Sequence, residues 1–249
     1  MRQPLTMGGQ PSSKKREVIN SRRHFLKIGG LAVAGSGLLL YSCIPEDEPF
    51  AQERQHEGDV FDLGSGDLGI LNFAYALEQL EAAFYTRVLD GSYWANASPI
   101  ERLYMEDIQG HEVIHREFFK AAINSVAPPE KVLPELEFDF SSVDFSDRDS
   151  VLRTSILLED TGVAAYNGAG DLIDLTLYLL LAGKIVSVEA RHAAALRSVY
   201  LEGFTEFAGD DVVNEQGLDV ARRPQTILQE VGSTGFIITP FTANNLPTE

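Results

Sequence analysis

Four long stretches of this chain repeat apolar residues at the helical period, and each stretch carries acidic or imidazole side chains within its apolar stripe. In chain order these side chains are Glu78, Glu112 with His115, Glu159, and Glu189 with His192. A charged residue on a solvated helix face needs no explanation, whereas several carboxylates buried together without a cation cost several kcal/mol each. The pattern therefore predicts an all-α fold in which four helices surround a polar interior.

Local signals place the helix ends. The first helix is expected over about 68–90 with Asp67 as its cap, and the second over about 99–125 with a capping box formed by Ser98 and Glu101. The third is expected to start near residue 146 with Asp149 as its capping partner, and glycines at 168 and 170 should interrupt it. The fourth is expected over about 174–200, and Gly183 within it is expected to permit close packing of helices.

The connector lengths predict the topology. The first link is short, which is typical of antiparallel neighbours, but the second link, about 126–145, contains three prolines and is long enough to pass the length of a helix. This predicts a four-helix bundle with one long crossover between helices two and three. Apolar residues that alternate with polar ones should hold the crossover against the bundle: Phe138, Phe140, Val143 and Phe145. The tail, 201–249, is expected to be irregular apart from a short helix near 224–231.

The six polar side chains predict a pair of metal ions. One Glu from each of two helices, together with a Glu-x-x-His pair from each of the other two, is the ligand set of a bundle that binds two metal ions. Residues three apart lie on the same helix face, so each pair can present a carboxylate and an imidazole to one region. Four carboxylates and two imidazoles suit divalent iron or manganese. A single Glu-x-x-His is usually a solvated pair, so the prediction depends on its repetition.

An internal repeat supports the same interpretation. Glu78 is followed seven residues later by Tyr85, and Glu159 seven residues later by Tyr166, so that Glu-x6-Tyr precedes Glu-x-x-His twice. This indicates a pseudo-two-fold bundle. Each tyrosine could bond a ligand carboxylate or donate an electron nearby, although a tyrosine at such a position is more often a core residue with a satisfied hydroxyl.

Two further residues near the predicted site have open roles. Glu81 lies one turn after Glu78 and could be an extra ligand, an outer group or a rim charge; the repeat favours Glu78, because the position that matches Glu81 in the third helix is Gly162. His111 precedes a ligand and should point about 100° away from it, which assigns it to the outer shell or the surface.

The first 42 residues are interpreted as an export signal. Arg22 and Arg23 precede the apolar run 28–42, a pattern similar to a twin-arginine signal. The run has 15 residues, fewer than the roughly 20 that a membrane-spanning helix needs. Cys43, the only cysteine of the chain, ends a pattern similar to a lipoprotein cleavage box. An incidental thiol is the alternative, but its position favours a lipid anchor on an exported protein facing the periplasm or the outside.

Charge divides the chain in the same way. Residues 1–42 carry seven Lys or Arg and one Glu, a net charge of +6, so the total of −17 leaves −23 on the remainder. Such an acidic surface repels nucleic acid. We therefore expect an export signal over 1–42, an acidic tether over 43–66, the bundle over 67–200 and an extension over 201–249.

Residues 66–197 resemble a ferritin-like domain of the desiccation-related type. Three segments carry the resemblance: Leu71 to Tyr85, Ala164 to Ala169 and Val188 to Ala193. The resemblance implies a di-iron or di-manganese centre that acts on peroxide, dioxygen or Fe(II), but it does not select one reaction. A complete rubrerythrin is disfavoured, because a four-cysteine iron site cannot form with one cysteine.

Two other functions compete with a redox enzyme. The bundle could be a non-catalytic acidic envelope protein with a structural or vestigial metal site, in keeping with its charge. Iron storage in a hollow shell is disfavoured by the tether, which would have to leave a closed cage. Iron versus manganese, the reductant and the oligomeric state stay open.

Overall fold

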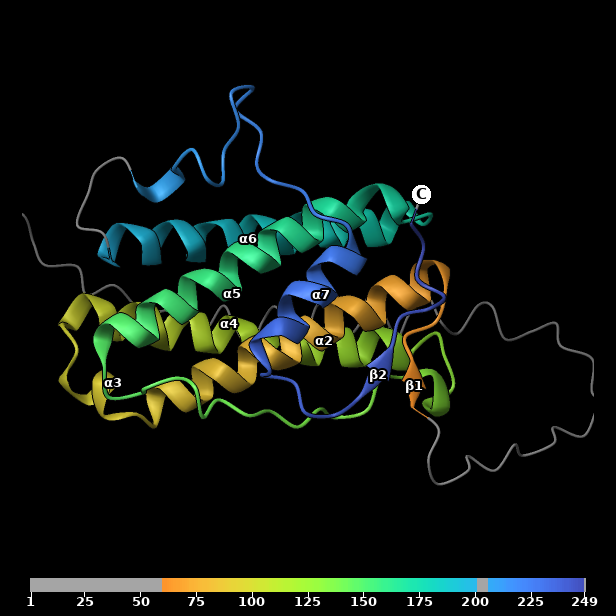
Figure 1. The fold of residues 1–249 in the computed structure, drawn as a ribbon. Coiled ribbons are helices and arrows are strands. Elements are labelled where there is room, and N and C mark those ends of the chain that lie inside the picture. Colours follow the sequence, from red (N-terminus) through yellow and green to blue (C-terminus); the bar gives the residue numbers. More distant parts are fainter. Residues whose placement is uncertain (1–59, 201–205, 249) are drawn as a thin grey trace, which may run out of the picture. The chain divides into compact units, whose positions relative to one another are not determined.

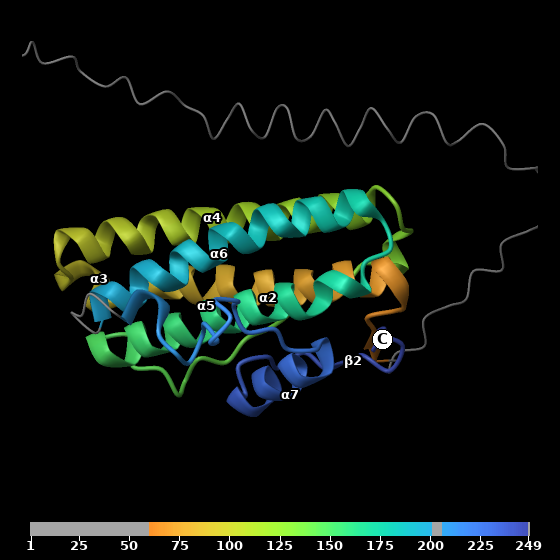
Figure 2. The ribbon, with the colours of Figure 1, turned by 90° about the horizontal axis from the view of Figure 1, so that it is seen from above.

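The computed structural model describes residues 60–200 and 206–248, shown in two views in Figure 1 and Figure 2. Its architecture is all-α, as predicted, and is built on four long helices: α2 (Gly66–Leu89), α4 (Pro99–Asn124), α5 (Arg148–Ala169) and α6 (Thr176–Tyr200). Among the described residues, none of the helices combines the length and apolar character needed to cross a membrane.

The helices pack as two pairs joined by a long crossover. Helix α2 lies along α4, and α5 lies along α6. Each pair has a short link: α3 (Ser92–Asn96), which was not predicted, lies in the first, and the 3₁₀ helix η2 (Gly170–Leu172) lies in the second. Figure 1 shows the segment between α4 and α5 returning along the bundle to the end where α3 lies. The predicted crossover is therefore confirmed.

Buried amides of α2 hold the crossover in place. Asn72 donates to the carbonyl of Lys131 at 2.9 Å and accepts from the backbone N–H of Leu133 at 3.0 Å. Gln79 accepts from the N–H of Leu136 at 2.9 Å. Because a buried amide is stable only when it is hydrogen-bonded, these contacts explain why α2 can bury Asn72 and Gln79.

Aromatic side chains of the crossover complete this attachment. The rings of Phe140 and Phe145 pack against Phe84 of α2 at centroid distances of 5.7 and 5.8 Å, and Val143 is buried. The prediction that alternating apolar residues pin the crossover is confirmed. As a result α2 is covered on nearly all sides, which explains its almost uniformly buried residues.

The helix starts confirm one predicted cap and correct two. Helix α4 has the expected capping box of Ser98 and Glu101. Helix α5 is capped by Asp147, which accepts from the N–H of Ser150, and not by a start near residue 146 with Asp149 as the capping partner. Asp67 does not cap its own helix either.

Asp67 instead bonds the backbone just before a different helix. Its carboxylate accepts the backbone N–H groups of Asp174 and Leu175 at 2.8 and 3.0 Å, just before α6 begins. On sequence, the Asp67 carboxylate was expected to cap α2, the nearest helix. In the folded chain the residues just before α6, which are distant in sequence, lie beside it. The contact ties the beginning of α2 to the beginning of α6.

The C-terminal extension is mostly irregular and carries the predicted short helix, α7 (Pro224–Thr234), which packs on α5. It also contains η3 (Glu206–Ala208) and the strand β2 (Phe241–Thr242), which pairs in parallel with β1 (Phe61–Asp62). This pairing was not expected. Residues 61–63 were assigned to the tether on sequence, but they belong to the folded unit. Residues 61 and 62 form β1, and Leu63, which follows β1, is fully buried.

Two predictions about glycines are corrected. Helix α5 continues through Gly168 and gives way to η2 only at Gly170. Gly168 is buried, and a Cβ placed on it would lie 1.8 Å from the carbonyl oxygen of Arg222, so this glycine allows the extension to lie against α5. Gly183, expected to permit close packing of helices, has open space around its Cβ position.

Candidate metal centre

Each long helix sends acidic or imidazole side chains into the same region of the bundle interior. Helix α2 contributes Glu78, α5 contributes Glu159, and α4 and α6 each contribute a Glu-x-x-His pair. The four carboxylate residues have no exposed surface, and His115 and His192 have side-chain exposures of 12% and 7%. The polar interior predicted from the stripes is therefore present.

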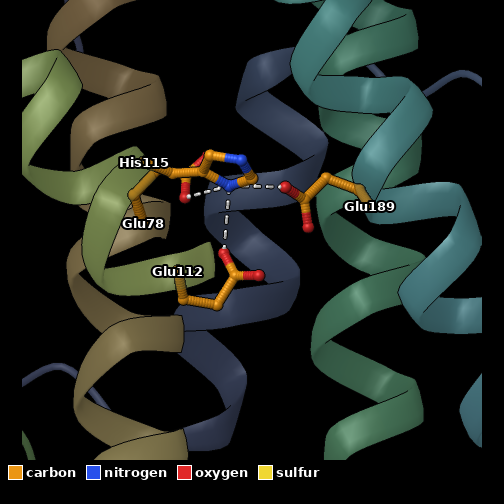
Figure 3. Close-up of side chains that lie close together, drawn as sticks. All are labelled: Glu78, Glu112, His115 and Glu189. Atoms are coloured by element: carbon orange, nitrogen blue, oxygen red, sulfur yellow. Dashed lines mark ion pairs between the residues drawn. The ribbon is translucent and has the colours of Figure 1, made fainter. Parts of the chain in front are cut away.

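The first group of potential ligands surrounds His115 (Figure 3). The Nδ1 atom of His115 lies 2.9 Å from Oε1 of Glu189, and 3.4 Å from both Oε2 of Glu78 and Oε2 of Glu112. One potential ligand atom from each of the four residues lies within 4.8 Å of the others. Three helices thus converge on one position.

The second group surrounds His192. Its Nδ1 atom lies 3.0 Å from Oε1 of Glu112 and 3.2 Å from Oε2 of Glu159. It also lies 3.6 Å from Oε2 of Glu189, and the four potential ligand atoms again lie within 4.8 Å of one another. The geometry mirrors the first group, as expected for a pseudo-two-fold bundle.

Glu112 and Glu189 belong to both groups, and each divides its two oxygens between them. Glu112 directs Oε2 toward His115 and Oε1 toward His192, while Glu189 directs Oε1 toward His115 and Oε2 toward His192. Each group is completed by one further carboxylate and one imidazole: Glu78 with His115, and Glu159 with His192. This arrangement could hold two metal ions side by side. The sharing follows from the packing and was not predicted from spacing.

The hydrogen bonding of the cluster fits a cation better than it fits the protein alone. Several buried polar atoms make no hydrogen bond within the described residues: Glu78 Oε2, both oxygens of Glu112, Glu159 Oε1, both oxygens of Glu189 and His115 Nδ1. Buried polar atoms are normally satisfied, and unsatisfied ones cost free energy. Lone pairs that converge without bonding one another are the pattern expected of metal ligands, so the donor set fits divalent ions.

The pKa values show how unfavourable this cluster is without a cation. Burial, reinforced by Glu189 and Glu112 and opposed by His115, raises the pKa of Glu78 to about 8. Burial would also raise the pKa of Glu189, but the two nearby imidazoles, His115 and His192, lower it to about 2. Burial disfavours charged His192, yet the surrounding carboxylates raise its pKa to about 12. Protons thus stand in for the positive charge that the carboxylates require.

Each tyrosine of the repeat directs its hydroxyl toward a carboxylate on the other helix of the repeat. The hydroxyl of Tyr166 on α5 donates a short hydrogen bond to Oε1 of Glu78 on α2. Tyr85 on α2 is fully buried, and its hydroxyl makes no hydrogen bond to any described residue. Burial and then the Glu159 carboxylate raise the pKa of Tyr85. Tyr166 therefore orients the candidate ligand Glu78. Tyr85 has a hydroxyl without a described partner beside the candidate ligand Glu159.

Glu81 lies outside both groups although it is only 3% exposed. Its pKa is raised well above the usual range by burial and then by the four carboxylates of the cluster. A Cβ at Gly162 would lie 3.1 Å from its Oε1, so this glycine provides the space for the carboxyl group. Among the open alternatives, the position of Glu81 agrees with an outer group beside the cluster.

His111 contacts the cluster from outside. Its Nδ1 lies 2.9 Å from Nε2 of His192, the nitrogen that faces away from the carboxylates. The two rings are stacked with an interplanar angle of 8°. Of the two alternatives left open, outer shell or surface, this contact supports the outer shell. The partner could not be named from sequence because it lies on another helix, α6.

The comparison with known families agrees with this geometry. A ferritin-like domain matches residues 66–202, more than half of the 249 residues, so the chain belongs to the ferritin-like domain family. No curated protein matches the chain.

Proposed function

We propose that the chain is a dinuclear iron or manganese oxidoreductase that consumes peroxide or oxidises Fe(II). The observation that carries the proposal is the division of the Glu112 and Glu189 oxygens between two groups, each completed by one imidazole and one terminal carboxylate. A structural ion needs only one such group. Two ions that share carboxylates can exchange two electrons with one small oxidant.

The donor chemistry supports iron or manganese. The cluster offers carboxylate oxygens and imidazole nitrogens, and its hard, oxygen-rich character suits these ions. The only cysteine of the chain lies at position 43, outside the described residues. A thiolate-based zinc or iron–sulfur site is therefore not what this cluster would form.

Both proposed reactions balance in atoms and electrons without a further oxidant or reductant. In Fe(II) oxidation, two Fe(II) become two Fe(III) while dioxygen takes up two electrons and two protons and becomes hydrogen peroxide. In peroxide consumption, one hydrogen peroxide is oxidised to dioxygen and a second is reduced to two waters. A bound metal pair would supply the electron transfer that the side chains cannot perform.

The protein side chains would position and protonate the reactants. Tyr166 holds Glu78 in a fixed orientation through its hydrogen bond. Tyr85 is fully buried, and none of the residues in 60–200 and 206–248 accepts a hydrogen bond from its hydroxyl, so it can donate one to a small oxygen species near Glu159. Burial of the cluster excludes bulk water, which strengthens these interactions.

Metal analysis and activity assays test this proposal. Protein purified from its native host should contain about two iron or manganese ions per chain, as expected for this ligand set. The loaded protein should evolve dioxygen from peroxide or oxidise Fe(II), and Glu112→Ala with His115→Ala should abolish the activity. Glu106→Gln, an exposed carboxylate on the same helix, is the matched control.

The competing functions give different results in the same assays. A non-catalytic acidic envelope protein would show neither activity with either metal, and the Glu112 and His115 changes would leave stress protection intact. A storage shell would elute as a very large assembly on size exclusion.

We further propose that the protein is exported and anchored by a lipid on Cys43, and that it serves in oxidative or desiccation stress. Arg22, Arg23 and Cys43 support this on sequence, and all three lie outside the described residues. Folding before twin-arginine export would let the site bind its metal in the cytoplasm, away from competing copper and zinc. Mass spectrometry of the native N-terminus should find an acylated Cys43; cleavage elsewhere would contradict the anchor.

A further inference from the structure

A small apolar cavity lies between the four long helices, next to the candidate metal centre. Its volume is about 40 Å³. Its inner wall includes Leu77, which precedes Glu78, and Tyr166, which donates its hydroxyl hydrogen to Glu78. Its other end is lined by half-buried Tyr178 and Ala182 near the start of α6. The cavity therefore extends from near the start of α6 to side chains that adjoin Glu78, a member of the group around His115.

Small side chains on all four helices create this space. The alanines that line it are Ala74, Ala122, Ala165, Ala169 and Ala182. Interiors are normally packed without gaps, and a larger apolar residue at any of these positions would reduce the cavity. All four long helices contribute to the cavity, and Ala74 lies one helical turn before Glu78. This arrangement is the one expected of a binding site rather than of a chance packing gap.

Most of the lining is hydrocarbon, and its only polar side chains are Asp67, Tyr166 and Tyr178. The Tyr166 hydroxyl is engaged by Glu78, and the Asp67 carboxylate accepts two backbone N–H groups near the start of α6. The rest of the inner wall is hydrocarbon, including Leu77 and Phe119. A buried water needs about two to four polar partners, and hydrogen peroxide has two O–H groups with similar needs. The cavity is therefore suited to a dry, apolar occupant.

The size restricts that occupant to very few atoms. The volume of about 40 Å³ exceeds the roughly 10–15 Å³ that one water-sized molecule occupies, but is well below the ~150 Å³ of a cavity that accepts benzene. Dioxygen is apolar and diatomic, and it is a reactant of the Fe(II) oxidation given above.

We propose that this cavity binds dioxygen and delivers it to the metal position beside Glu78 and His115. The inference rests on the proposed function and narrows it: dioxygen, rather than peroxide, is the oxidant that this chain is built to admit. Peroxide fits less well, because its two O–H groups would find few polar partners in this largely hydrocarbon lining.

Xenon binding tests the cavity without any metal chemistry. Crystals of the protein pressurised with xenon should show an atom between Leu77 and Tyr178. Ala182→Leu, which fills the outer end, should remove it, while Ala121→Leu, at an exposed position of α4, should retain it. Absence of xenon from the unmodified protein would overturn the inference while leaving metal binding and Fe(II) oxidation untouched.

Kinetics test the delivery of dioxygen. In Fe(II) oxidation, Ala182→Leu should raise the KM for dioxygen by roughly three- to tenfold with little change in kcat, because it hinders access and leaves the chemistry intact. Oxidation of Fe(II) by added hydrogen peroxide should be unaffected by this change. An unchanged KM for dioxygen in a variant that no longer binds xenon would refute the delivery role. Loss of all Fe(II) oxidation in unmodified, metal-loaded protein would instead refute the proposed function.

Discussion

His111 and His192 form a stacked pair in which Nδ1 of His111 lies 2.9 Å from Nε2 of His192. Nδ1 of His192 faces the carboxylates, so a metal ion there would require the Nε2 hydrogen to point at His111. No corresponding imidazole contact involves His115 among the described residues. The two halves of the candidate centre are therefore inequivalent despite the repeat in the sequence.

This pair predicts a site-specific effect of changing His111. His111→Phe should weaken binding of one metal ion by roughly 10–100-fold, because outer hydrogen bonds fix the orientation and tautomer of a ligating imidazole. The ion beside His115 should be unaffected. Stepwise cobalt titration followed by absorption distinguishes the two, and His111→Gln, which keeps an acceptor, should recover part of the affinity. Equal weakening of both ions would contradict the assignment.

The shared carboxylates predict different metal contents for two otherwise similar changes. Glu112→Ala should abolish tight binding of both ions, since Glu112 directs one oxygen to each group, whereas Glu78→Ala should leave one ion bound beside His192. Elemental analysis gives the metal per chain, with Glu106→Ala as the exposed control. Retention of two ions by the Glu112 variant would rule out a shared ligand.

Glu81 predicts the opposite behaviour. Because it lies outside both groups, Glu81→Gln should leave the metal content unchanged. Its raised pKa keeps the carboxyl group neutral in metal-free protein, so a nearly isosteric amide should alter the free energy of unfolding by less than about 1 kcal/mol. Urea denaturation and elemental analysis check both points, and a loss of metal would make Glu81 a ligand after all.

Metal-free protein should lose stability as the pH rises from about 4.5 to about 8. Burial raises the pKa of Glu78 from 4.5 to about 8, so the stability it contributes is complete below 4.5 and is lost as the pH rises through 8. His192, raised from 6.5 to about 12, acts in the same direction above pH 6.5. Glu189, lowered from 4.5 to about 2, contributes stability above pH 4.5 that is lost only as the pH falls toward 2.

Calorimetry with a chelator present should therefore give a lower Tm at pH 8 than at pH 5. Glu78→Gln should flatten this dependence, because the amide cannot titrate. Added manganese should raise the Tm more at pH 8 than at pH 5, since metal ions and protons compete for the same ligands. A metal-free Tm that rises with pH over this range would contradict the protonation pattern.

Two glycines predict opposite effects of the same substitution. Gly168→Ala should destabilise the protein by several kcal/mol, because its Cβ would collide with the backbone of Arg222. Gly183→Ala, at an exposed helical position with open space, should stabilise it by about 0.5–1 kcal/mol. Urea denaturation measures both. Comparable effects at the two positions would show that the extension does not pack closely on α5.

The sequence by itself determined the four helices, the long crossover and the side chains that meet in the interior. Helical periodicity depends on local spacing, so Glu112 and His115 could be assigned to one face before any packing was known. The capping box of Ser98 and Glu101 is equally local, and it was predicted and found.

Only the tertiary structure decided contacts between distant segments. In the folded chain Asp67 bonds the backbone just before α6 rather than capping α2, and His111 contacts His192. The two oxygens of Glu112 are divided between the two groups of potential ligands. The tertiary structure also left the cavity beside Tyr166, which depends on alanines from four helices meeting at one level. Such contacts follow from the rotation and depth of each helix in the bundle, which side-chain packing sets and residue spacing does not.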